Sequence, residues 1–215
     1  MNSIALIGDD NSDYFVSILR ALVKSKLTLS YLIICGSNKS DFANTIYAID
    51  NNFSLKNIEK IQCNLINPNL IQICEENSIP CFWVNQSNSP IVSRILSQYP
   101  VDVLFVTKWP IKEEVIYIPR LFVLSCCTSS VPTGTENVTI NFPLNHKYSG
   151  MVYLYVMQPY TNREIILVKK RYNINKEDTL EKVNKKLQIE CINLSIEVLN
   201  KIQNDKIPQL HYQKE

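Results

Sequence analysis

The chain has 215 residues, 46% of them hydrophobic and 20% charged, which is enough for one well-buried domain and short for two. Its formal net charge of +2 supplies no large electrostatic attraction to nucleic acid or to an anionic membrane, so neither is expected as a partner. Because no run of eighteen apolar residues and no secretory signal pattern occurs, we expect a soluble, cytoplasmic protein.

The first part of the chain alternates strand and helix patterns. A short buried strand ends at Gly8, a second ends at Gly36, and "IPCFWV" is the third. A polar stretch from 37 to about 65 lies between the second strand and Asn67-Pro68, which is typical of a helix N-cap followed by proline. The helix after the first strand has one apolar face, formed by Phe15, Ile18, Leu19 and Leu22.

The second part predicts a short helix in "SPIVSRILSQYP", a central strand in "VDVLFVT", a helical turn in "EEVIYIP" and a strand in "RLFVLS". That last strand leads into "SCCTSSVP", residues 125–132, where we expect the chain to leave the sheet. Residues 150–158 and "REIILVKKRYNI" then form a hairpin, in which the run Lys169 to Arg171 is its solvated end.

A long helix closes the chain, and Asp178-Thr179 followed by Glu181 resembles a capping box at its start. We therefore predict one α/β domain over residues 1–203 with a polar tail at 204–215: a Rossmann-like, mostly parallel sheet with helices on both faces, a C-terminal hairpin and a long helix. The apolar stripe of that helix consists of Leu180, Val183, Leu187, Cys191, Leu194, Val198 and Ile202.

The seven cysteines are odd in number and scattered, and they include no Cys-x-x-Cys pair. This pattern argues against a disulfide framework and against a zinc site, so no metal centre is expected. Of the adjacent pair Cys126 and Cys127, we expect one to be buried and the other to line a cleft, with neither of them catalytic.

Several segments together resemble the formyltransferase family, which includes glycinamide ribonucleotide formyltransferase, the catalytic domain of methionyl-tRNA formyltransferase and amino-sugar N-formyltransferases. "ICEENSIPCFWV" is similar to the family's helix-then-"gIPv" passage, and "SSVP" matches the end of its signature N-x-H-P-S-L-L-P at Ser129 and Pro132. Counted from Gly134, Gly150 falls on the glycine of "tGvti". The resemblance covers residues 3–202.

The resemblance implies the formyl donor 10-formyltetrahydrofolate and an amine acceptor, bound at the carboxyl ends of the strands. In the family an Asn and a His stabilise the oxyanion, and an Asp supports the His charge. The matching positions here are Ser125, Cys127 and Thr161, so all three catalytic side chains differ. Losing one oxyanion donor costs about 100- to 1000-fold in rate, which predicts that ordinary formyl transfer is nearly abolished.

Two further groups of positions follow from the resemblance. The passage after the central strand, with Val106, Thr107 and Trp109, corresponds to the family's contacts with the cofactor. On the substrate side stand Gly8, Asp9 and Glu136. Because the turn "GDDNSD" carries carboxylates in place of a Gly-rich phosphate cradle, a phosphorylated acceptor is not expected.

Three hypotheses for function stay open. In the first, a divergent member without the usual triad chemistry binds a small molecule or a protein partner in the inherited cleft. In the second, a one-carbon or acyl transferase uses a remodelled site of Ser125, Cys127 and Thr161, with Cys127 as a nucleophile if a neighbour lowers its pKa. In the third, the chain is a folate-binding module.

Overall fold

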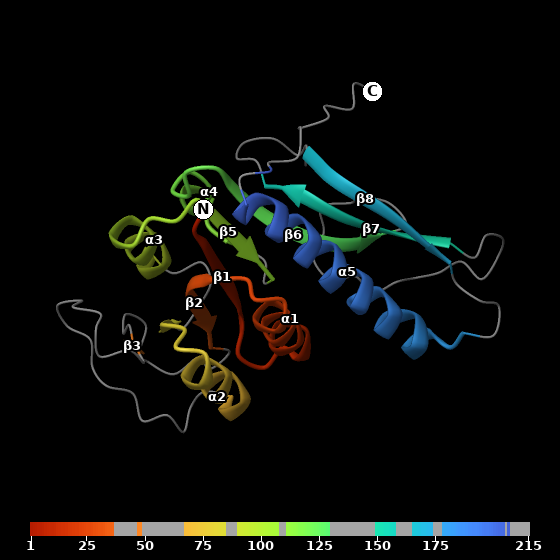
Figure 1. Ribbon diagram of the computed structural model, residues 1–215, viewed down its shortest axis with the longest axis horizontal. Helices are drawn as coiled ribbons and strands as arrows, with labels where there is room; N and C mark the ends of the chain where they lie inside the picture. The colour runs from red at the N-terminus through yellow and green to blue at the C-terminus, as the bar shows by residue number, and fades with distance from the viewer. Residues whose placement is uncertain are drawn as a thin grey trace.

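The computed structural model describes residues 1–36, 47–48, 67–84, 90–107, 111–129, 149–157, 165–173, 178–204 and 206. These residues form one eight-stranded sheet with helices packed against both of its faces (Figure 1). The strands are β1 Ile4–Asp9, β2 Leu29–Cys35, β3 Tyr47–Ala48, β4 Cys81–Val84, β5 Val103–Val106, β6 Phe122–Ser129, β7 Ser149–Val156 and β8 Ile165–Asn173. The helices are α1 Asp13–Lys24, α2 Pro68–Glu76, α3 Pro90–Gln98, α4 Glu113–Ile116 and α5 Leu180–Gln203.

The sheet has the strand order β3-β4-β2-β1-β5-β6-β7-β8. Strands β4, β2, β1, β5 and β6 are parallel to one another and form the centre of the sheet. At one edge β3 pairs antiparallel with β4. At the other edge β7 pairs antiparallel with β6, and β8 pairs antiparallel with β7. The chain runs outward from β1 through β2 to β4 and then returns to place β5 on the other side of β1. The sheet therefore has its topological switch point between β1 and β5, confirming the predicted Rossmann-like architecture.

Each face of the sheet has its own apolar layer. On one face α1, α2 and α5 pack over a cluster that includes Leu6, Phe15 and Val152, and on the other face α3 and α4 pack over Ile7, Val92 and Val115. The four apolar residues predicted on α1 are fully buried, and so is the α5 stripe wherever its side chains are described. Strand alternation sends successive residues into opposite layers, so β1 and β5 are buried on both sides.

Side-chain caps begin the helices where the sequence predicted them. The Asn67 side chain accepts a hydrogen bond from the N–H of Asn69 at 3.0 Å, and Pro68 follows at the first helical position. At α5 the Thr179 hydroxyl accepts from the N–H of Lys182 at 3.3 Å. The capping box is incomplete, however, because Lys182, and not Glu181, occupies the third helical position, where the reciprocal acceptor of a capping box must stand.

Strand β6 is longer than predicted, because the chain does not leave the sheet at Ser125. It continues to Ser129, pairing with β7 from Cys126 opposite Leu154 to Ser129 opposite Met151. The antiparallel partner satisfies the backbone groups that a loop would have left to water. The start of "SCCTSSVP" is therefore strand, which corrects the expectation of a loop there. Residues 130–132 lie outside the described residues.

No helix among the described residues combines the length and the apolar character that crossing a membrane requires.

Asp102, just before β5, fixes the start of β1. Its carboxylate accepts hydrogen bonds from the N–H and the hydroxyl of Ser3, both at 2.8 Å, and its own N–H donates back to the Ser3 hydroxyl at 3.0 Å. These hydrogen bonds from Ser3, with a smaller contribution from the nearby Arg120, lower the pKa of Asp102. The interaction aligns the two strands that flank the switch point.

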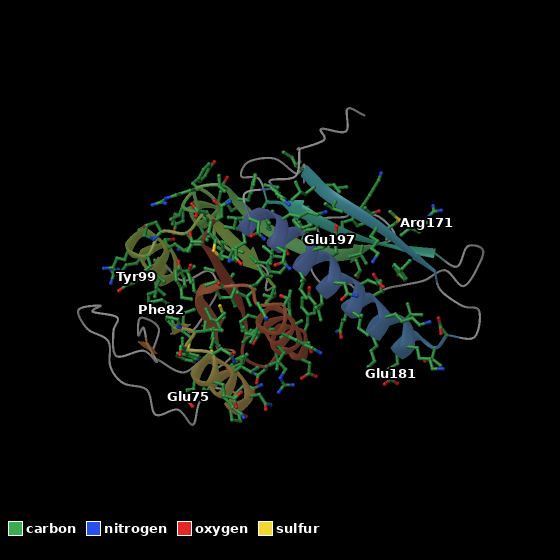
Figure 2. The ribbon with its side chains drawn as sticks, in the orientation of Figure 1. Glu75, Phe82, Tyr99, Arg171, Glu181 and Glu197 are labelled. Carbon is green, nitrogen blue, oxygen red and sulfur yellow. The ribbon has the colours of Figure 1, made fainter. Side chains whose placement is uncertain are left out.

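Asp102→Asn should lower the free energy of unfolding by about 1 to 2 kcal/mol at neutral pH, because a charge-assisted pair of hydrogen bonds is replaced by neutral ones. The folded pKa lies below the unfolded one, so this stabilisation is present above the unfolded pKa of about 3.9 and is lost as the pH falls through the folded pKa. Urea unfolding at several pH values measures it. Glu75→Gln, which removes an exposed carboxylate from α2 (Figure 2), is the matched control and should change stability by less than about 0.5 kcal/mol. A difference that persists unchanged at low pH would contradict this assignment.

Candidate functional site

The candidate site lies at the carboxyl ends of β1, β5 and β6, next to the switch point where open α/β sheets bind ligands. Gly8 and Asp9 end β1, while Val106 ends β5 and Thr107 follows it. Ser125 lies opposite Val106 in the parallel pairing of β5 with β6. The structure thus brings five of the predicted site residues to one edge of the sheet.

Gly8 is closely packed on its α1 side. A Cβ atom added at Gly8 would lie 2.2 Å from Cδ2 of Phe15 and 2.3 Å from Oγ1 of Thr107. Real Cβ contacts are never this short, so the aromatic ring and the hydroxyl fill the space that a side chain would need. Gly8 is therefore required by close packing between β1, β5 and α1.

The described polar groups at the strand ends donate to the sheet itself. Thr107 donates both its N–H and its hydroxyl proton to the carbonyl oxygen of Ile7, at 2.9 and 3.0 Å. Ser125 donates its hydroxyl proton to the carbonyl oxygen of Val106 at 2.9 Å. Each hydroxyl has a single proton, so in this arrangement neither can donate to a ligand.

Val106 and Thr107 are the described positions of the predicted cofactor site, and their predicted role remains a prediction. The Val106 side chain is only 1% exposed, and both donors of Thr107 are bonded to Ile7. The Val106 side chain and the two donors of Thr107 therefore offer no proton to a ligand in this arrangement. The remaining predicted positions, Trp109, Thr161 and Glu136, lie outside the described residues, so their predicted roles remain predictions.

The turn after β1 is held by its own hydrogen bonds. The Asp9 carboxylate accepts from the N–H of Asn11 at 3.2 Å, and the Asp9 carbonyl accepts from the N–H of Ser12 at the same distance. The next residue, Asp10, is buried, with 6% exposure, and its carbonyl accepts from the side-chain amide of Asn67 at 3.2 Å. Asp10 and the turn that contains it thus lie between the N-terminal ends of α1 and α2.

Sequence reasoning missed the tie between Asn67 and Asp10. The N-cap pattern of Asn67 was visible, but its side chain both caps α2 and donates to a residue 57 positions earlier. Only the fold places those two segments together.

Ser125 and Cys127 face the same side of the sheet. Their neighbours across β6 and β7 are Tyr155 and Tyr153, and Tyr155 packs against the layer under α3 and α4. Thr107 and the space beside Gly8 lie on the opposite side, toward Phe15 of α1. The predicted residues thus meet at one edge of the sheet but are divided between its two faces.

Cys126 faces α5 and packs against the layer that contains Cys191. The adjacent Cys191 thiol and burial raise the pKa of Cys126 well above its usual value, and burial likewise raises the pKa of Tyr14. Cys126 is therefore a protonated thiol of low nucleophilicity. Both cysteines of the pair are half-buried, Cys126 on the α5 face and Cys127 on the other face, whereas one of them was expected to be buried.

None of the six cysteines in the described ranges forms a disulfide, and nowhere in those ranges do three or more His, Cys, Asp or Glu side chains gather as metal ligands would.

Comparison with solved structures identifies the fold, although no protein-family model and no curated protein matches the sequence. The structure is similar to phosphoribosylglycinamide formyltransferase from Bacillus halodurans, with 12% identity, a TM-score of 0.62, and coverage of 98% of this chain and 100% of that one. Glycinamide ribonucleotide transformylase 1 from Geobacillus kaustophilus gives 10% identity, a TM-score of 0.64, and coverage of 94% and 98%.

A sugar N-formyltransferase from a Shewanella species covers this whole chain with 75% of its own length, at 14% identity and a TM-score of 0.61. These likenesses extend over 94 to 100% of this chain. The fold expected from the sequence motifs is thereby confirmed: this chain has the formyltransferase fold.

Proposed function

We propose that this protein is a divergent member of the formyltransferase fold that does not transfer formyl groups by the usual Asn, His and Asp, and that acts by binding a small molecule or a protein partner. The observation that carries the proposal is the hydrogen bond from Ser125 to Val106. The family's Asn position is occupied by a side chain whose only proton is donated within the sheet. An oxyanion needs a donor that is directed at it, and this one is directed at a neighbouring strand.

The second family position supports the same proposal. Cys127 stands where the family has His, and it lies within β6, paired with β7 at Tyr153. A cysteine side chain carries no positive charge in either protonation state, so Cys127 cannot supply the charge that a protonated imidazole gives to the reaction. Its neighbour Cys126, with a raised pKa, cannot serve as a thiolate nucleophile in its place.

The β1–α1 turn supports the exclusion of phosphorylated ligands. A phosphate would have to enter beside the carboxylates of Asp9, Asp10 and Asp13, at a turn whose backbone N–H groups already bond to Asp9 and Cys35. The carboxylates would repel a phosphate, and the N–H groups that already donate within the protein are not available to bind it. A ligand of this end of the sheet is therefore expected to be uncharged or cationic.

If Gly8 is present for packing and not for phosphate binding, Gly8→Ala should lower stability by about 1 to 3 kcal/mol, the usual cost of overpacking. Phe15→Leu, which shortens the ring that the new Cβ would meet, should recover part of the loss when combined with it. A double-mutant cycle from denaturant midpoints measures this coupling. Additive losses, or an alanine variant as stable as the wild type, would refute the packing role.

The hypothesis of a folate-binding module is tested by thermal shift with a stable analogue of 10-formyltetrahydrofolate. Ligand binding to the native state raises the midpoint in proportion to RT ln(1 + [L]/Kd). Because the described donors at the end of β5 are bonded within the sheet, we expect a shift below about 1 °C at ligand concentrations up to the millimolar range. A saturable shift of several degrees would show a retained folate site and favour one-carbon chemistry.

A further inference from the structure

Among the described strands, β8 is the longest, and it lies at one edge of the sheet. It ends the strand order, with β7 on its inner side, and it runs for nine residues (Figure 1). The opposite edge, β3, has only two residues. Within the described ranges no strand pairs with the outer side of β8, which therefore presents a row of backbone donors and acceptors for a further strand.

The side chains of β8 divide it into two halves. Ile165 to Val168 are apolar and pack wholly or partly into the sheet, whereas Lys169, Lys170 and Arg171 are all exposed. Lys170 is held toward α5 by an ion pair with Glu190, at 2.7 Å.

Lys169 and Arg171 lie on the face away from α5, because side chains alternate along the strand. Neither forms an ion pair with a described residue, and Figure 2 shows Arg171 projecting outward from the end of the sheet. Across the ladder they lie opposite Tyr153 and Met151 of β7. These two cations are thus available to an anionic neighbour next to β8.

A second copy of the chain is a poor neighbour for the charged half of this edge. Antiparallel self-pairing centred on Lys170 would place the two Lys170 side chains opposite each other and Lys169 opposite Arg171. Like charges directly across a ladder are destabilising, and edge lysines are a common protection against self-association. A strand that carries acidic residues has the opposite charge, so it would be attracted to Lys169 and Arg171 and not repelled by them.

We propose that β8 binds an extended, acidic segment of another protein as an additional antiparallel strand, by main-chain pairing with side chains that select the sequence. Antiparallel pairing continues the arrangement of β6, β7 and β8. Because the directions oppose, the acidic residues of the partner precede its apolar ones, and two carboxylates spaced two residues apart face Arg171 and Lys169. This surface lies on the edge strand, apart from the ends of β1 and β5, and it does not depend on any chemistry at those ends.

The test uses a fluorescent nine-residue peptide of alternating valine and threonine with glutamate at its third and fifth positions. Two control peptides carry lysine at those positions, or proline at the fourth and sixth. Only the glutamate peptide should bind measurably by fluorescence anisotropy.

The variant Lys169→Glu/Arg171→Glu should weaken binding of the glutamate peptide at least about tenfold and should gain binding of the lysine peptide. Lys182→Glu/Lys185→Glu on α5 makes the same charge change away from the edge and should leave the affinity unchanged.

Hydrogen exchange should slow at the amides of β8 when the glutamate peptide is bound. No binding of that peptide at millimolar concentration, or equal binding of the proline peptide, would overturn the proposal. So would preferential binding of a single-stranded oligonucleotide, which cannot pair with the ladder, or a protein dimer that the peptide dissociates. A folate site found by the thermal-shift experiment would leave this proposal intact, so the two can fail separately.

Discussion

The carbonyl oxygens at the carboxyl ends of the parallel strands impose the constraint on which this structure depends. At the switch point, where sheets of this kind usually hold their ligands, Ile7 and Val106 present carbonyls at the edge of a sheet buried on both faces. Here the N–H and the hydroxyl of Thr107 donate to the Ile7 carbonyl, and the hydroxyl of Ser125 donates to the Val106 carbonyl. The two hydroxyls at the candidate site thus donate to the sheet itself, and a hydrogen bond of this kind contributes about 1 kcal/mol to stability.

The antiparallel extension fixes the directions in which the side chains after Ser125 point. Because β7 pairs with β6 as far as Ser129, the residues after Ser125 are strand residues with fixed, alternating directions. Ser125 and Cys127 therefore share one face, while Cys126 faces α5 and lies against a layer that includes Cys191. The same extension ends in β8, so one structural element both fixes the directions of Ser125 and Cys127 and forms the edge of the sheet.

Local patterns predicted the scaffold well. The α1 face, the Asn67 cap, the hairpin and the long helix each follow from short-range periodicity or capping chemistry, and the family motifs identified the fold at an identity that solved relatives place at 7 to 14%. Three features could not be read from the sequence. The extension of β6 depends on a partner strand that follows twenty residues later, the Asn67 contact joins distant segments, and the hydrogen bond of Ser125 depends on the strand beside it. All three are long-range contacts.

The central proposal is that Ser125, at the position that the resemblance matches to the family's Asn, stabilises the sheet and not a transition state. A single-turnover assay tests it most directly: excess protein is mixed with 10-formyltetrahydrofolate and a panel of amines that includes amino sugars and glycinamide ribonucleotide, and the formylated amine is quantified. We predict product at the uncatalysed rate for the wild type, Ser125→Ala and Cys127→Ala alike, with Ser125→Ala less stable by about 1 kcal/mol because a buried carbonyl loses its donor. Formylation by the wild type that falls 100-fold or more in Ser125→Ala or Cys127→Ala would contradict the claim.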